Sequence, residues 1–573
     1  FKSNDGESTI LFPANKYLCK MDMFTWFMEQ DEIELSKNGG SDVSIDTDLD
    51  LAVSNFYSTH PKQDSLNFKA PKAKFAIKTK VITCSKTEFI DVADARIFPE
   101  SMKVVIRRNA KMDELINSKI VANYITKYHQ IINAKTKITA RKAYKASGDY
   151  PYYDIDSNQS LIYFKDIRLD EGFQTIAEGK IKENRKFKFS PQFDFYGDVS
   201  MKSSDPFLTF TGATRISHDC ASMAKNWMSF SAQINPKEIM IPVSNTMKNL
   251  EGKPLSAGIV LRDSEEEDSV DVYPTFLSSL DSDRDQIIVT ASGFLKYDFD
   301  ASEFQIASKE KFVNRNAPGN YISLHTKSCS MQGDGEVNLG GFYGDLSFKP
   351  VGIVNYNQAN GSVELNLSGK MDFALDKGAW EKVAEKMINE TEGQAINMDQ
   401  TTLEQAIATN VDQKTADKIK SDYTLKGEVK KIPKDMNSTI YLTNVKLKWD
   451  KELTSFVSSS NKIGIVSLYG KSVFKELTGK MQFQKSPSTD GKYVDKLKML
   501  FETPTSYYFF DYKFTTKKKV ENGDGRMQLY STDGAFKQEI LDIKPDKKKV
   551  KQFDYDITNN SSGAAIFRSN SDD

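Results

Sequence analysis

Two stretches of alternating sequence decide the fold: Asp194-Phe195-Tyr196-Gly197-Asp198-Val199 and Leu208-Thr209-Phe210-Thr211-Gly212-Ala213. Apolar and polar side chains alternate in both, and this period of two predicts half-buried β-strands. A glycine interrupts each stretch, which favours a backbone bend or bulge at that point. The same strand-glycine pattern recurs further along the chain, at 292–293, 343–344, 368–369, 426–427 and 478–479.

These repeated glycines predict sheets that curve. We expect a mainly β fold of curved or rolled antiparallel sheets, forming a β-groove or a sandwich-like body. Ordinary sandwiches with incidental glycines are the alternative. The spacing of the glycines is irregular, so a strict short-period solenoid is excluded.

One segment departs from the β pattern and predicts a small helical insert. Trp380, Val383 and Met387 recur at the spacing of one helix face, and two further helices are expected at 402–409 and 413–421. A short helix is also expected near Cys220, extending to Trp227. The predicted division is a mixed N-terminal segment at 1–55, a large β body at 56–375 with a subdomain boundary near 220–260, the helical insert at 376–423, a C-terminal β domain at 424–557 and a flexible tail at 558–573.

Composition excludes several classes of protein. The 573 residues are enough for about three to five domains at roughly 100–200 residues each. An aromatic content of 11% is too high for a disordered chain. The 78 Lys and Arg against 79 Asp and Glu leave a net charge of −1, so we expect no nucleic-acid partner. No apolar run approaches the length of a membrane-spanning helix.

The four cysteines, Cys19, Cys84, Cys220 and Cys329, lie far apart and form no CxxC pair. Local spacing therefore excludes a zinc ribbon or a thioredoxin-type motif. One or two long-range disulfides and isolated buried thiols both remain open. The chain begins with Phe1 rather than Met, so we expect it to be processed or cut from a longer polypeptide.

His218 and Cys220 form the tightest cluster of catalytic residue types. On a strand the two side chains would share one face across Asp219. They could then act as a base and a nucleophile, or bind a metal with a third ligand from elsewhere. The alternative is a buried thiol beside a surface histidine at a strand-to-helix junction.

Asp281, Asp283 and Asp285 are the second candidate site, because alternating carboxylates can supply the several oxygens that a cation such as Ca²⁺ requires. An aspartate-rich turn is the alternative.

Phosphate-binding loops and the GxSxG and HExxH motifs are missing from the sequence, so we predict a non-enzymatic protein with no cofactor. The basic run Lys547-Lys548-Lys549 predicts a solvated turn or a contact with an anionic surface.

A set of segments spread over most of the chain carries a family resemblance: 64–68, 92–99, 128–134, 144–150, 210–212, 218–220, 272–276, 319–324 and 462–465. These segments resemble large uncharacterised β-rich cell-envelope proteins of Bacteroidota, and the chain looks like the C-terminal part of such a protein. The phrase Ala93-Asp94-Ala95-Arg96-Ile97-Phe98-Pro99 is also similar to the rungs of lipopolysaccharide-transport β-jellyroll proteins. Neither resemblance implies a catalytic role for any residue.

The resemblance implies an exported protein in the periplasm, in the outer membrane or at the cell surface. We therefore expect a structural or assembly component of the envelope that binds other envelope proteins in a larger assembly. The first alternative is a groove protein that handles lipid or lipopolysaccharide. The second is a glycan-binding or hydrolytic module that uses surface aromatic and aspartate residues.

Overall fold

The computed structural model describes residues 8–37, 54–264, 269–282, 284–341, 343–390, 395–397, 401–426, 429–485, 492–517 and 523–569. Strands hold 53% of the residues and helices 15%, in curled antiparallel sheets that include a half-barrel, which confirms the predicted fold class. The chain forms two compact units, the first from Phe1–Ser217 and Trp227–Ile241 and the second from His218–Asn226 and Pro242–Asp573.

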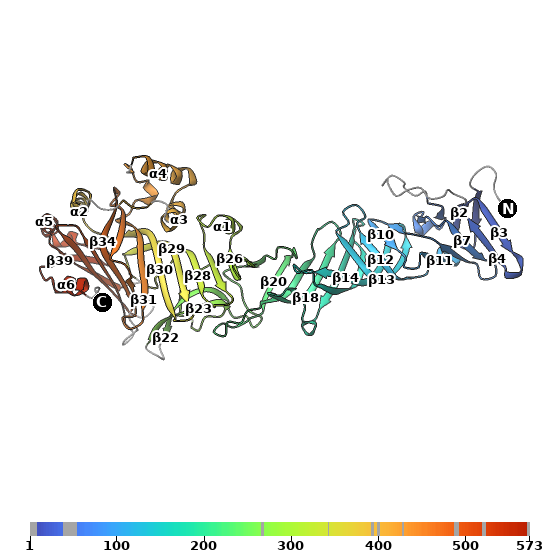
Figure 1. Ribbon diagram of the computed structural model, residues 1–573, viewed down its shortest axis with the longest axis horizontal. Coiled ribbons are helices and arrows are strands. Elements are labelled where there is room, and N and C mark those ends of the chain that lie inside the picture. The colour runs from blue at the N-terminus through green and yellow to red at the C-terminus, as the bar shows by residue number, and fades with distance from the viewer. Residues whose placement is uncertain are drawn as a thin grey trace. The chain divides into compact units, whose positions relative to one another are not determined.

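The described residues of the first unit form three antiparallel sheets, and several of their strands are labelled in Figure 1. A four-stranded sheet has the order β1 (Ser8–Phe12), β2 (Tyr17–Met21), β5 (Phe56–Ser58) and β6 (Asn67–Phe68). A five-stranded sheet has the order β11 (Lys103–Ile106), β8 (Val81–Ser85), β7 (Lys72–Ala76), β4 (Glu32–Ser36) and β3 (Met23–Phe27).

The third sheet of this unit has eleven strands that follow one another almost in chain order. They are β20 (Met228–Gln233), β19 (Thr209–Ile216), β18 (Phe193–Lys202), β16 (Thr175–Ile181), β15 (Gln159–Leu169), β14 (Ala143–Tyr153), β13 (His129–Ala140), β12 (Leu115–Ala122), β10 (Ala95–Phe98) and β9 (Ile90–Val92), with β17 (Lys188–Ser190) beside β18. Aromatic rings fill one face of this sheet. Phe189, Phe195 and Phe210 are at most 1% exposed, and their ring centroids lie 4.8–5.2 Å apart. The rings form a packed core here.

Gly197 and Gly212 show why glycine recurs in the strands. They face each other in the antiparallel pair of β18 and β19. A Cβ on Gly212 would lie 2.4 Å from the carbonyl oxygen of Tyr196. Gly197 has a φ of +148°, which residues with side chains rarely adopt. The close approach of the two strands and the φ of Gly197 therefore require glycine at both positions.

The second unit is built on a sixteen-stranded sheet, which curls into the half-barrel. Its order is β21 (Ile241–Val243), β25 (Gly293–Asp298), β26 (Glu303–Ala307), β27 (Tyr321–His325), β28 (Met331–Glu336), β29 (Ser347–Asn357), β30 (Ser362–Asp372), β31 (Ile440–Asp450), β32 (Ser455–Ser458), β34 (Lys471–Lys485), β35 (Lys492–Glu502), β36 (Tyr507–Lys517), β37 (Gly523–Ser531), β39 (Phe553–Ile557) and β38 (Lys549–Val550), with β33 (Lys462–Leu468) paired to β31 and β34. A smaller sheet has the order β23 (Ser269–Ser278), β22 (Ser256–Ser264) and β24 (Gln286–Thr290).

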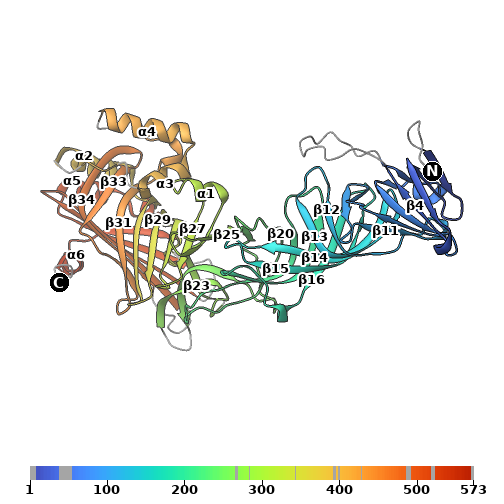
Figure 2. The same ribbon diagram turned by 45° about the vertical axis from the view of Figure 1, so that its right-hand side comes forward.

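Within the described residues, the second unit also has α-helices at α1 (Lys309–Val313), α2 (Lys377–Glu390), α3 (Thr401–Asn410), α4 (Gln413–Lys426), α5 (Gly534–Asp542) and α6 (Ser562–Ser569). The three helices predicted in the insert are confirmed as α2, α3 and α4. Figures 1 and 2 show α3 and α4 together beside β29 and β31. Leu403 of α3 and Tyr423 of α4 belong to one buried cluster with Tyr441 of β31.

The helices do not separate two β domains, contrary to the division predicted at 376–423. Strand β30 lies before them and β31 after them, yet Leu365 pairs with Leu447 in one continuous sheet. Their amphipathic faces pack on that sheet: the ring of Trp380 stacks on Phe510 with centroids 5.6 Å apart. The β strands from 424 onward therefore extend the sheet that begins before the helices.

Two further sequence predictions differ from the structure of the described residues. The segment from Cys220 to Trp227 forms turns and extended chain rather than a helix, because a disulfide holds it at Cys220. The flexible tail predicted at 558–573 contains α6, which packs Ala564 and Phe567 against Phe509 of β36. This contact buries Ala564 to 1% exposure.

Candidate functional site

Cys220 forms a disulfide with Cys329 inside the second unit. The His218 side chain is 4% exposed, and its Nδ1 accepts a hydrogen bond from the backbone N–H of Cys220 at 3.2 Å. Burial lowers the pKa of His218 and so favours the neutral imidazole. Since the sulfur is already bonded, Cys220 offers no thiolate to a substrate or a metal. His218 and Cys220 therefore make a structural junction.

Asp281 and Asp285 are held by groups of their own turn and of the strands β22 and β23. The Asp281 carboxylate pairs with Arg262, and its backbone N–H donates to the Tyr273 hydroxyl. That hydroxyl donates to Asp285 at 2.6 Å, and Asp285 also accepts the N–H of Ser282 at 3.0 Å. The two carboxylates thus stabilise the aspartate-rich turn. Asp283, the third candidate, lies outside the described residues.

Metal ligands do not gather elsewhere in the described ranges, where no three His, Cys, Asp or Glu side chains are placed to hold a metal ion. Among the helices that the structure describes, none combines the length and apolar character needed to cross a membrane.

Cys19 and Cys84 are buried free thiols. Burial raises the pKa of Cys19 to about 12 and that of Cys84 well above its usual value, so neither is an activated nucleophile.

An apolar strip lies on the exposed face of β14 and β15. Tyr153, Leu161 and Tyr163 are 52–55% exposed although each lies within a strand. Leu161 pairs with Pro151, which places the four side chains along one face. The strip runs diagonally over about four residues, or roughly 13 Å of strand. We call Pro151, Tyr153, Leu161 and Tyr163 the outer strip.

Polar groups flank the outer strip. Asp149 lies directly opposite Tyr163 and accepts a hydrogen bond from Asn133 Nδ2 at 3.1 Å. Gln159 Nε2 donates to the Tyr153 hydroxyl at 3.2 Å. Exposed aromatic surface beside a carboxylate and two amides suits a partner that offers both apolar area and hydrogen-bonding groups.

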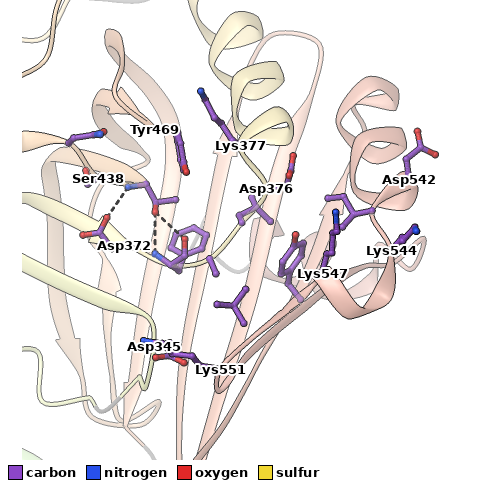
Figure 3. A pocket seen from close by; sticks show the side chains of 18 residues that line it. Asp345, Asp372, Asp376, Lys377, Ser438, Tyr469, Asp542, Lys544, Lys547 and Lys551 are labelled. Atoms are coloured by element: carbon purple, nitrogen blue, oxygen red, sulfur yellow. Dashed lines mark hydrogen bonds between the residues drawn. The ribbon is translucent and has the colours of Figure 1, made fainter. Parts of the chain in front are cut away.

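The second unit contains a cleft of about 1050 Å³ between the end of β30, the start of α2 and the segment that follows α5. Figure 3 shows Lys544 and Lys547 on one side and Asp372 and Ser438 on the other. Lys551 also lines the cleft. Lys548, three residues earlier, is buried, and its Nζ forms an ion pair with Asp556 Oδ1 at 2.9 Å. This ion pair lowers the pKa of Asp556 and anchors the lysine-rich segment.

The aspartates of the cleft bind its own backbone. Asp372 accepts the N–H of Thr439 at 3.0 Å, and Asp345 accepts the N–H of Gln552 at 2.8 Å. Asp376 caps α2 by accepting the N–H of Gly378 at 2.8 Å. These bonds fix the walls of the cleft and the start of the helix.

Sequence reasoning missed both surfaces for different reasons. A signal for the outer strip exists in the run from Leu161 to Phe164, which is apolar on both strand faces. The cleft combines segments around Asp345, Asp372, Ser438 and Lys547 that only the folded sheet brings together. Of these segments, only the Lys547–Lys549 run stood out in the sequence. Comparison with protein-family models found no match, and comparison with curated proteins found none either.

Proposed function

We propose that the chain is a non-enzymatic structural or assembly component of a bacterial cell envelope, of the Bacteroidota type that its segments resemble, and that it acts through extended β surfaces. The outer strip carries this proposal. Soluble sheets normally present polar residues on the solvent face, whereas Tyr153, Leu161 and Tyr163 place apolar area there. Such area on an exposed sheet face is typical of a contact with another molecule.

The Cys220–Cys329 disulfide supports the exported location in this proposal. Disulfides persist in oxidising compartments and are rare in the cytosol. We expect protein alkylated directly in cells to show two reactive thiols after denaturation, those of Cys19 and Cys84, and four after reduction as well. Four alkylated thiols without reduction, or recovery of the protein from the cytosol alone, would contradict export.

The experiment for the assembly function is photo-crosslinking from position 163 in living cells. A photoreactive amino acid replacing Tyr163 should give discrete adducts with envelope proteins. The same residue in place of Phe173, an exposed ring in a turn outside the strip, is the matched control and should give none. The adducts should disappear in the Leu161→Ser variant. Equal adducts from both positions, or none from position 163, would overturn the proposal.

Glycan binding is a second candidate, favoured by the carboxylate and amides beside the outer strip. Tyr153 and Tyr163 could stack on sugar rings while Asp149 and Gln159 bind hydroxyl groups. Affinity electrophoresis in gels containing envelope polysaccharide should then retard the wild-type chain but not the Tyr153→Ala/Tyr163→Ala variant. Equal mobility of the two proteins in every polysaccharide would exclude this candidate.

A lipid-handling groove stays a prediction, and the packing of β18 and β19 gives it no specific support. Phe195 and Phe210 on these strands pack against each other and are at most 1% exposed. A lipid chain would need an apolar channel at this place, and the rings already occupy it.

A further inference from the structure

We propose that the cleft between β30, α2 and the segment after α5 is a binding site for a phosphate-bearing organic ligand. The site lies in the second unit, apart from the outer strip of the first unit, so the proposal is independent of the function proposed above.

Unpaired lysines supply the charge for such a ligand. Lys544, Lys547 and Lys551 line the cleft within eight residues of one another, around the short helix η6 (Pro545–Lys547). None of the three forms an ion pair with a carboxylate of the described residues, whereas Lys548 between them does. An ammonium group is a compact charge with three donors, and it suits phosphate oxygens. Among the described residues, no arginine lines the cleft, so the planar fork that favours bidentate carboxylate binding is missing there.

The carboxylates of the cleft accept hydrogen bonds from other groups of the protein. Asp345, Asp372 and Asp376 each accept a backbone N–H at 2.8–3.0 Å. Asp542 accepts a hydrogen bond from Gln538 Nε2 at 2.7 Å. These four aspartates fix the walls of the cleft through neutral donors and keep their charge, and none of them forms an ion pair with Lys544, Lys547 or Lys551.

Ser438 is an independent sign of a ligand. Its side chain is 6% exposed, and its Oγ has no hydrogen-bond partner among the described protein atoms. The next residue, Thr439, is fully engaged, because its Oγ1 accepts the N–H of Phe373 at 3.2 Å and donates to the Phe373 carbonyl at 3.0 Å. A buried hydroxyl without a hydrogen-bond partner is unfavourable. A ligand oxygen in the cleft would satisfy it.

Apolar and aromatic side chains contribute much of the remaining lining, and they indicate that the ligand is larger than a phosphate ion. Leu375 and Tyr555 are at most 7% exposed, while Tyr469 at the rim is 44% exposed. The volume of about 1050 Å³ is slightly above the usual range for small-molecule sites. A sugar phosphate and a phospholipid headgroup share this chemistry, a phosphate attached to a hydroxylated or apolar body.

The test measures binding of defined probes to the full chain. The probes are inorganic phosphate, a hexose 6-phosphate, and phosphatidylcholine vesicles with or without phosphatidylglycerol. Isothermal titration reports the soluble probes and flotation reports the vesicles. The cleft variant is Lys544→Gln/Lys547→Gln/Lys551→Gln. The matched control is Lys135→Gln/Lys137→Gln/Lys145→Gln, which removes three exposed lysines from β13 and β14.

We expect the cleft variant to bind the organic phosphate at least about tenfold more weakly than wild type, with the control unchanged. Ser438→Ala should weaken binding by about threefold to tenfold, the loss of one hydrogen bond. Cleft-dependent binding of the hexose phosphate identifies a soluble ligand, and cleft-dependent binding of the phosphatidylglycerol vesicles alone identifies a headgroup. Equal losses in the cleft and control variants, inorganic phosphate bound as tightly as the organic probes, or no binding of any probe would overturn the proposal.

Discussion

Gly212 is the residue at which the strand-glycine pattern can be tested most directly. A Cβ at this position would meet the Tyr196 carbonyl oxygen at 2.4 Å, which is backbone and cannot move aside. We expect Gly212→Ala to lower the free energy of unfolding of the first unit by about 1–3 kcal/mol, as overpacking does. Urea denaturation followed by circular dichroism measures the change.

Gly534 provides the control for that substitution. It is the first residue of α5, and a Cβ there would have no atom within 4 Å. Gly534→Ala should leave stability unchanged or raise it by about 0.4–1 kcal/mol, because alanine restricts the unfolded chain. If both alanines had the same effect, the close approach of β18 and β19 would not explain why glycine occupies position 212.

His129 makes the stability of the first unit depend on pH. The ring is fully buried, with Nε2 2.6 Å from the Asp205 carbonyl and Nδ1 3.2 Å from the Tyr150 hydroxyl. Burial lowers its pKa, so the folded chain keeps the neutral ring after the unfolded chain has taken up a proton. The free energy of unfolding must therefore fall as the pH drops below about 6.5, the ordinary histidine pKa, and level off below the folded pKa.

We expect His129→Gln to remove this contribution, which is at most about 1.4 kcal/mol per pH unit. The measurement is urea denaturation of both proteins between about pH 7 and pH 5, within the range around the histidine pKa. If the free energy of unfolding of the variant had the same dependence on pH, His129 would have the same pKa in the folded and unfolded chains.

At the scale of elements, a buried ion network joins α1 to β28. Asp334 of β28 is 2% exposed and lies 2.9 Å from Nζ of Lys311, itself 1% exposed. Arg315 contacts the second carboxylate oxygen. Removing one partner leaves a buried charge uncompensated, so Asp334→Ala should lower the free energy of unfolding of the second unit by about 3–5 kcal/mol.

Replacing both partners separates the value of the ion pair from the penalty of a lone charge. The Lys311→Met/Asp334→Leu variant should be markedly more stable than Asp334→Ala, because neither side chain then carries a buried charge. Thermal and denaturant unfolding of the three proteins makes the comparison. A double variant as unstable as Asp334→Ala would indicate that the geometry of the network matters more than its charge.

Elements whose signal is local could be predicted from the sequence. Trp380, Val383 and Met387 predict α2 because their spacing of three and four residues places them on one helix face within a single short segment. The pairing of Leu365 with Leu447 could not be predicted, since the helices between them read as a domain boundary. Spacing also could not select the Cys220–Cys329 bond, because four cysteines allow several pairings.

The candidate sites could be predicted to a smaller extent than the helices, because their residues come from distant segments of the chain. The run at Lys547 was visible, but its relation to Ser438 and Asp372 depends on strands more than sixty residues apart in the chain. Asp281 and Asp285 gave a correct signal of acidic residues in a turn. Their hydrogen-bond partners, which decide between a cation site and a structural turn, could be identified only in the folded protein.

At the scale of the whole molecule, the continuous sheet predicts how the chain responds to being divided. Separate chains 1–390 and 395–573 should associate when they are produced together, because β30 and β31 pair along most of their length. The chain 424–573 alone should fail to unfold cooperatively, since the edge of β31 and the apolar face under α3 would both be exposed. Co-purification through a tag on one chain and calorimetry of 424–573 measure these outcomes. A sharp calorimetric transition for 424–573 would instead indicate an independent domain.

The nearly sequential strand order in both large sheets has a consequence for the order of folding. Most strands pair with the strand just before them in the chain, so little loop-closure entropy opposes pairing, and contact order stays low for a β protein. The pairs β21 with β25 and β30 with β31 are exceptions, because other elements lie between them in the chain. We expect the sheets to grow from their N-terminal strands while later residues are still being synthesised. The parallel pairing of β39 with β37 requires α5 between them. The edge that carries the lysine-lined cleft therefore forms last, and the cleft exists only in a fully assembled chain.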